Sequence, residues 1–217
     1  MMSQALWSPI WISLQLASIT TLVLLLIGVP LAWWIVHLRG IPRAMLESLV
    51  AVPLVLPPTV LGFYLLLLLG PNGPFAPLGL VFSFPGLVIG SVLFSLPFMV
   101  RPVQSAFEAI AGNIFETAAS LGAGPWQRFS HLALPLAKNG IFSGAILGFA
   151  HTLGEFGMVL MVGGNLPDRT RVLSIAIFDA VERTEYGQAH LLSFGLVLFS
   201  FIAMVLVAVL NRKADPR

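Results

Sequence analysis

Charged residues are scarce in this sequence. They make up 9% of its 217 residues, whereas hydrophobic residues make up 58%. A soluble domain carries about 25% charged residues. A chain of this length cannot bury so much apolar surface in its own core, so the apolar side chains must face lipid. The composition therefore indicates a membrane protein. Basic residues beside membrane spans account for the sequence pI of about 9.5, and no nucleic-acid partner is predicted.

Other features are missing altogether. The chain has no cysteine, which excludes disulfides, thiolate metal sites and cysteine nucleophiles. It has no Gly-x-x-x-x-Gly-Lys-Ser/Thr loop, so it does not bind ATP by that route. The N-terminus lacks a basic region and a small-residue cleavage site, so we expect the first apolar stretch to remain as a transmembrane helix. No nucleophile and base occur at a suggestive spacing, so no catalytic residue, metal site or enzymatic activity is predicted.

Long apolar runs are what the sequence does contain. A helix needs about 20 apolar residues to cross a bilayer. No charged residue occurs between Ser48 and Val100, and a cluster of Gly, Pro and Asn at 70–77 divides this stretch into two spans. We therefore expect an all-α integral membrane protein with one domain over residues 1–217. Its five transmembrane helices are predicted at about 10–36, 47–69, 85–105, 139–162 and 190–210.

The basic residues orient these spans. Five spans place the two termini on opposite sides of the membrane. One side carries eight of the Lys and Arg residues, namely Arg39, Arg43, Arg101, Arg128, Lys138, Arg212, Lys213 and Arg217. The other side carries three, namely Arg169, Arg171 and Arg183. Because basic residues concentrate in the cytoplasm, the N-terminus is predicted outside and the C-terminus inside. Residues 106–138 then form a cytoplasmic loop and 163–189 an external loop.

The 106–138 loop is amphipathic. Apolar residues follow helical spacing at Ile110, Ile114, Ala118 and Leu121. Asn113 is predicted to cap this helix with Glu116 as its capping-box partner, and Gly122 to end it in a left-handed conformation. Gly124-Pro125 is expected to start a second short segment. The pattern fits a helix lying on the membrane surface as well as a helix that docks on another protein.

One motif in this loop is specific. Glu116-Thr-Ala118, then Gly122, then Leu132-Ala-Leu134-Pro135 resembles the EAA loop of ABC importer permeases. The family pattern is Glu-Ala-Ala, three residues, Gly, nine residues, then Ile-x-Leu-Pro, from which only Thr117 and Leu132 depart. The resemblance implies a type I ABC importer permease fold, whose helix between the third and fourth spans docks on an ATPase subunit. It assigns ATPase coupling to Glu116, Ala118, Ala119, Gly122, Leu134 and Pro135.

The same resemblance implies the partners. The permease would form a homodimer in a bacterial cytoplasmic (inner) membrane, bind two ABC ATPase subunits and receive its cargo from an external or periplasmic oxyanion-binding protein. The subunit itself would bind no cofactor, since ATP and Mg belong to the ATPase.

A carboxylate occurs inside the fourth predicted span, in Gly154-Glu155-Phe156-Gly157. A charged side chain there costs about 2.5–3.5 kcal/mol, so Glu155 should face protein or water. His151 precedes it by four residues and can pair with it on one helix face. The pair could serve as the proton relay of a proton-coupled secondary transporter. Because a carboxylate would repel an anionic cargo, we favour gating or helix packing for His151, Gly154, Glu155 and Gly157.

The external loop points to the cargo. Its Gly-Asn-x-Pro-x-x-Thr-Arg run at 164–171 and Ile-Phe-Asp-Ala-Val-Glu stretch at 177–182 resemble the oxyanion permeases for molybdate, tungstate and sulfate. With the short chain, they resemble molybdate permeases most, and sulfate and tungstate remain alternatives. Arg169 and Arg171 are predicted to contact the binding protein, with direct anion binding and plain surface charge left open.

Overall fold

The computed structural model describes the backbone of residues 2–214 and the side chains of residues 7–212. Within this part every regular element is a helix, so the all-α fold is confirmed there. The long helices are α1 (Met2–His37), α2 (Gly40–Val55), α3 (Pro58–Leu69), α4 (Phe84–Glu108), α8 (Lys138–Gly154), α10 (Leu173–Glu182) and α11 (Tyr186–Ala214). The short ones are η1 (Ala76–Leu78), α5 (Gly112–Ser120), α6 (Pro125–Gln127), η2 (Arg128–Ala133), α7 (Leu134–Leu136) and α9 (Gly157–Gly163).

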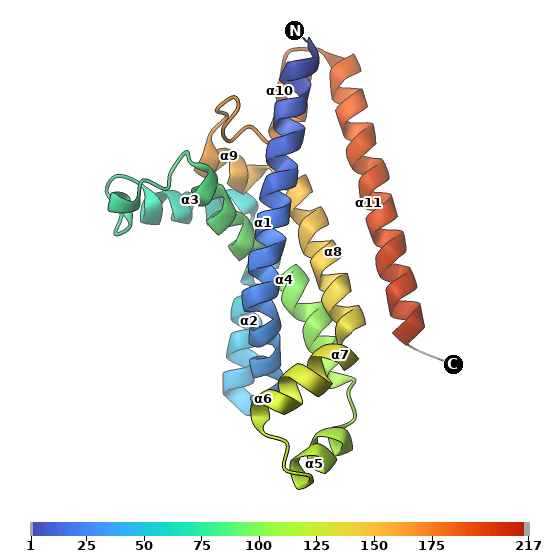
Figure 1. Cartoon of the computed structure of the whole chain (residues 1–217). Helices are drawn as coiled ribbons and strands as arrows, with labels where there is room; N and C mark the ends of the chain where they lie inside the picture. The colour runs from blue at the N-terminus through green and yellow to red at the C-terminus, as the bar shows by residue number, and fades with distance from the viewer. Residues whose placement is uncertain (1, 215–217) are drawn as a thin grey trace.

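Helices α1, α4 and α8 form the centre of the molecule, and α11 packs on the outside against α8 and α10 (Figure 1). Glycines allow the central helices to approach closely. A Cβ atom at Gly28 of α1 would lie 2.7 Å from the side chain of Met99 on α4. One at Gly144 of α8 would lie 2.9 Å from the Met99 carbonyl oxygen. Small residues at helix contacts are the usual means of close packing in lipid, where apolar burial drives association little.

Several helices have the length and hydropathy of membrane spans. Within the described part of the chain three qualify alone: Trp7–His37, Phe84–Glu108 and Tyr186–Arg212. Two bent pairs, Gly40–Val55 with Pro58–Leu69 and Pro125–Leu136 with Lys138–Gly154, raise the number to as many as five if each pair is one span. The chain is thus a multi-pass membrane protein.

Two of the expected spans each consist of two helices with a break between them. The expected helix over 47–69 is α2 and α3, which meet at 108°. Pro57 and Pro58 cause this break, because proline lacks an N–H and disfavours a helical residue before it. The expected helix over 139–162 is α8 and α9, separated by Glu155 with an extended backbone (φ −71, ψ 132).

The two breaks pack against each other. A Cβ atom at Gly157 would lie 3.3 Å from Pro58 and 3.5 Å from Thr59. Beyond the breaks, α3 and α9 stay in contact and lie to one side of the central helices (Figure 1). The break in Gly154-Glu155-Phe156-Gly157 thus lies at a long-range contact between two spans.

Candidate functional site

The segment that carries the EAA-like motif lies at the end of the bundle opposite the N-terminus, and we call this the α5 end (Figure 1). Here α5 follows α4, and α6, η2 and α7 lead back into α8. No residue of α5 is buried. A short helix without buried residues gains little stabilisation from packing against its own protein. Helix α5 is therefore a surface that a partner can contact.

The turn after α5 has the geometry that Gly122 predicts. Gly122 adopts φ +85, and its N–H donates to the carbonyl of Ala119 at 3.0 Å. The N–H of Ala123 donates to the carbonyl of Ala118 at 2.9 Å. These two bonds form a Schellman motif around a left-handed residue. The left-handed turn predicted at Gly122 is confirmed.

The start of α5 differs from the prediction. The cap is Ala111, with no side-chain hydrogen bond, and Asn113 lies inside the helix. Ile110 packs against the core next to the end of α4, which brings the chain into α5 two residues earlier than expected. The predicted capping box is therefore wrong. The Glu116 side chain is exposed and makes no hydrogen bond or ion pair to the described residues, so its carboxylate faces outward.

The motif residues divide into two groups. Ala118 and Gly122 line a hollow of about 470 Å³ together with Leu121, Ala123, Gln127, His131 and Leu132. Glu116 and Ala119 lie on the exposed surface of α5 beside it. Leu134 and Pro135 are instead part of α7. The structure thus gathers four of the six predicted coupling residues on one surface.

Leu134 and Pro135 shape the segment behind this surface. Because Pro135 cannot donate a hydrogen bond and crowds the carbonyl four residues earlier, the helix widens before it. In η2 the Leu134 N–H donates to the carbonyl of Phe129, five residues back, as in a π-helix. The chain then bends by 71° into α8. Their position favours a role in directing the loop rather than in forming its exposed surface.

An aromatic cluster beneath the loop was not found from the sequence. The ring of Trp33, near the end of α1, lies 5.2 Å from Phe107 of α4, 5.6 Å from Phe115 of α5 and 5.4 Å from Phe129 of η2, between centroids. These separations are those of favourable edge and tilted aromatic contacts. No spacing rule links positions so far apart in the sequence. The concentration of aromatic residues in the loop was the one signal that the loop packs against an apolar surface.

The predicted pairing of His151 with Glu155 is wrong. His151 bonds through Nδ1 to the hydroxyl of Ser95 at 2.9 Å and stacks on Phe98 at 3.9 Å between centroids. Glu155 lies beyond the last turn of α8, so the i, i+4 spacing no longer places both side chains on one face. The structure has no hydrogen bond or ion pair between these two described residues.

Glu155 sits at the helix break in a closed environment. The residue is 4% exposed, and neither carboxylate oxygen has a hydrogen-bond partner among the described residues. The hydroxyl of Ser91 lies beside it, short of hydrogen-bond geometry. Ser174 of α10 donates to its backbone carbonyl, which ties the break to α10. With Gly157 against Pro58, these contacts are those of a packing site, and gating stays a prediction.

The two arginines in the loop after α9, Arg169 and Arg171, differ. Arg171 donates through Nε to the side-chain oxygen of Asn165 at 2.6 Å and lies 3.6 Å from the carboxylate of Asp179. Asn165 in turn donates to both Asp179 oxygens, at 2.9 and 2.8 Å. Arg171 therefore holds the loop after α9 against α10, whereas Arg169 is exposed. A role in contacting a binding protein suits Arg169 better than Arg171.

Comparison with protein families decides the membership of this chain. Residues 16–217 match the model of the family described as "Binding-protein-dependent transport system inner membrane component". The chain belongs to this family.

Named relatives in this family are permease proteins. The chain is 54% identical over 204 residues to the molybdenum transport system permease protein ModB of Azotobacter vinelandii, covering 91% of this chain and 90% of the relative. It is 33% identical to ModB of Escherichia coli K12, with 97% of each chain covered. A probable sulfate transport system permease protein of Marchantia polymorpha is 28% identical, with 88% of this chain and 68% of the relative covered.

Solved structures of this fold come from ABC transporters. A chain of the MetNI methionine ABC transporter in inward-facing conformations superposes with a TM-score of 0.75 at 17% identity, covering 96% of this chain and 97% of that one. A chain of a bacterial alginate ABC transporter, in complex with a periplasmic protein bound to an alginate pentasaccharide, gives 0.73 at 17% identity, covering 97% and 78%. At these identities the likeness establishes the fold.

A polar network at the α5 end joins two spans of this permease. Arg43 of α2 donates to Glu47 at 2.8 Å and also pairs with Glu108 of α4. Gln104 donates to Glu47 at 2.7 Å and to Glu108 at 3.1 Å. The network holds α2 beside the part of α4 that leads into α5. Sequence reasoning missed it because the partners lie far apart along the chain.

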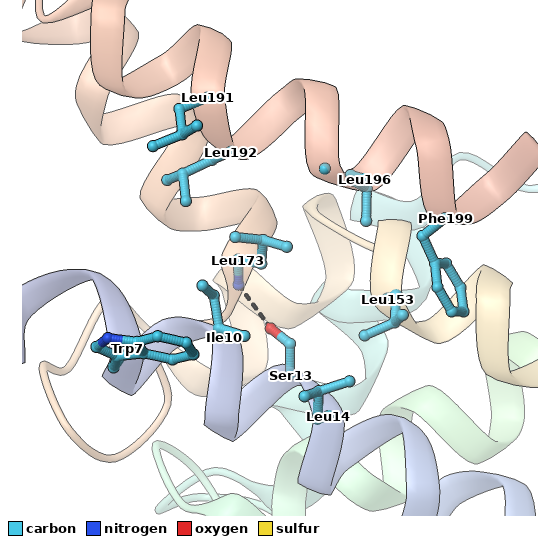
Figure 2. Close-up of a pocket in the computed structure, with 11 residues that line it drawn as sticks. Trp7, Ile10, Ser13, Leu14, Leu153, Leu173, Leu191, Leu192, Leu196 and Phe199 are labelled. Carbon is cyan, nitrogen blue, oxygen red and sulfur yellow. Dashed lines mark hydrogen bonds between the residues drawn. The ribbon is translucent and has the colours of Figure 1, made fainter. Parts of the chain in front are cut away.

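An apolar pocket of about 440 Å³ lies near the opposite end, between α1, α8, α10 and α11 (Figure 2). Its walls are side chains such as Trp7, Leu14 and Phe199. The hydroxyl of Ser13 already accepts the N–H of Leu173 at 2.7 Å (Figure 2). An oxyanion needs hydrogen-bond donors or positive charge, so this pocket is not an oxyanion site.

Proposed function

We propose that this chain is the membrane-spanning permease subunit of an ATP-binding-cassette importer that carries molybdate. The observation that carries the proposal is α5, a helix without buried residues that is ended by the Gly122 turn and bears the EAA-like motif. Such a helix supplies a small, convex surface that a groove on an ATPase can enclose. The choice of molybdate is supported by the 54% identity to a molybdenum permease over 91% of the chain.

The α5 end is proposed to face the cytoplasm, with the N-terminus outside. The charge distribution supports this orientation, because eight of the eleven Lys and Arg residues fall on the side of the α5 loop. ATP would then be hydrolysed by a pair of ATPase subunits bound at α5. The permease would hold no ATP, Mg or other cofactor and catalyse no reaction itself.

The remaining partners follow from the same model. Two permease subunits would form the anion path at their interface, and an external oxyanion-binding protein would deliver the anion. The family description names binding-protein dependence, and one similar solved structure includes a periplasmic binding protein. A path without basic groups deep in the membrane suits transit, because a tight site would trap a doubly charged anion.

A proton-coupled transporter is a weaker explanation. It would need a relay of titratable side chains, and its candidates, His151 and Glu155, are turned to different partners. A sulfate or tungstate permease differs from the proposal only in cargo.

Uptake by the purified complex in vesicles tests the proposal. Vesicles with trapped ATP should accumulate labelled molybdate only when the ATPase and the loaded binding protein are present, and excess sulfate should compete weakly. Accumulation driven by a proton gradient without ATP would contradict the importer assignment. Strong competition by sulfate would instead overturn the choice of anion, and competition by tungstate would extend it.

A further inference from the structure

Helix α5 touches the body of the protein through few side chains. Of its nine residues, only Phe115 and Ala118 are half-buried, and the others are exposed. Phe115 alone of these packs against the apolar core at the α5 end. Displacement of α5 by a bound partner can therefore reach the spans through the connecting backbone, through the contact of α5 with η2, or through Phe115.

Phe115 meets a side chain that belongs to a different span. Its ring lies 5.6 Å from that of Trp33 on α1, with the planes at 62°. Trp33 also contacts Phe107, near the end of α4, at 5.2 Å and Phe129 of η2 at 5.4 Å. One indole ring thus joins α1 to both chain segments that flank α5 and to α5 itself.

The position of Trp33 on α1 connects this contact to the rest of the bundle. Trp33 lies within the last two turns of α1, which continues through the molecule and packs on α4, α8 and α10. The helix continues without a break past Pro30, three residues before Trp33, so a displacement at the Trp33 end is passed into the bundle. At about 1.5 Å per residue, the 31 residues from Trp7 to His37 span roughly 46 Å, enough to cross the bilayer.

We infer that Trp33 is a positioning residue for transport, the side chain through which movement of α5 is passed to α1. The inference rests on the proposed function, since it takes the ATPase as the agent that moves α5. When the ATPases draw α5 aside, Phe115 presses on or withdraws from the Trp33 ring, and α1 tilts against α4 and α8. The connecting backbone alone moves α4 and α8, so loss of the ring contact separates ATP hydrolysis from the opening of the path.

Substitutions on the two sides of this contact test the inference. Trp33→Leu and Phe115→Leu remove the rings and keep an apolar side chain. Trp34→Leu is the matched control, because Trp34 is the next residue of α1, turned by about 100° and 57% exposed on the outer surface. Each variant is purified as the complete complex with ATPase and binding protein and placed in vesicles. The readouts are ATPase content, ATP hydrolysis and molybdate taken up per ATP hydrolysed.

We expect both ring variants to retain the ATPase and to hydrolyse ATP, while uptake per ATP falls about tenfold, within the range of usual coupling effects. Trp34→Leu should match the wild type. The double variant should be no worse than Trp33→Leu alone, because Trp33→Leu already removes the ring contact with Phe115. A purely structural role would instead lower complex yield and melting temperature and leave uptake per ATP unchanged.

Unchanged uptake per ATP in Phe115→Leu overturns the inference, and so does a double variant whose loss is the product of the single losses. If Trp33→Leu fails to assemble, the uptake per ATP of Phe115→Leu tests the inference instead. This variant should assemble, because α5 has no buried residues. Failure of the proposed function looks different: the wild-type chain would then show no ATPase content or no ATP-dependent uptake.

Discussion

The sequence made specific structural predictions for the α5 loop and for the region of the α8–α9 break. The prediction for the turn in the loop is confirmed, and the prediction for the break is wrong. In the loop, the left-handed Gly122 and its two hydrogen bonds involve residues no more than five positions apart. At the break, the expected pairing of His151 with Glu155 required α8 to continue. It ends at Gly154, and just beyond its end Gly157 packs against the distant residues Pro58 and Thr59. Local spacing therefore predicts local turns well and fails where a second span decides the backbone.

Of the substitutions in these two regions, Gly122→Trp is expected to have the largest effect, a loss of ATPase binding. In Gly122→Trp the backbone must leave or strain its left-handed conformation, at about 1–2 kcal/mol, and the indole fills the hollow beside α5. The protein should still insert, while ATPase content falls by about tenfold or more, equivalent to at least about 1.4 kcal/mol. Co-purification of the ATPase measures this.

Gly79→Trp is the matched control for this change. Gly79 is also left-handed (φ +59) with open space around it, and it lies in the connection between α3 and α4. Equal loss of ATPase in both variants would show that backbone strain alone is responsible, and the docking role of the Gly122 turn would have to be abandoned.

A smaller effect is expected in the loop between α9 and α10. Arg171→Ala removes a hydrogen bond and an ion pair around Asp179, whose side chain is only 16% exposed, and should lower the free energy of unfolding by about 1.5–3 kcal/mol. Arg169→Ala, at an exposed position, should stay within about 0.5 kcal/mol. Denaturant unfolding in detergent compares the two. A stable Arg171→Ala variant with impaired delivery of the anion would indicate that Arg171 acts on a partner after all.

The separation of His151 from Glu155 predicts a small coupling energy. In a double-mutant cycle of His151→Gln and Glu155→Gln, the two changes in unfolding free energy should add within about 0.5 kcal/mol. The preference for molybdate over sulfate should also be unchanged in Glu155→Gln. A coupling well above 1 kcal/mol would mean that the two side chains interact and would revive the proton relay.

The smallest effect is expected at Thr117, where the chain departs from the family motif. Its hydroxyl donates to the carbonyl of Asn113 in the same helix at 2.8 Å and the residue is exposed. Thr117→Ala trades this bond for a better helix former, a difference of less than about 0.7 kcal/mol. Uptake should equal that of the wild type, and a clear loss would place the hydroxyl in the docking surface.

Much of the fold and part of the site could be predicted from the sequence. Apolar run length gave the multi-pass helical architecture, and the motif gave α5 with its turn. The prolines at 57 and 58 give the bend between α2 and α3 a cause in the local sequence. The break after Gly154 could not be predicted in this way, because Gly157 meets Pro58 across two spans. The same holds for Trp33, which is linked to Phe115 only by the fold, and for Asn113, which lost its capping role when Ile110 packed into the core.

The central claim is that α5 is the surface on which an ATPase docks, and cross-linking tests it most directly. The chain has no cysteine of its own, so a single introduced cysteine can carry a photo-reactive maleimide at a chosen place. Attached at Ala119→Cys, on the exposed surface of α5, the probe should cross-link to the ATPase subunit. Attached at Glu182→Cys, at the exposed end of α10, it should not. Cross-linking of the ATPase from position 182 and not from position 119 would contradict the account.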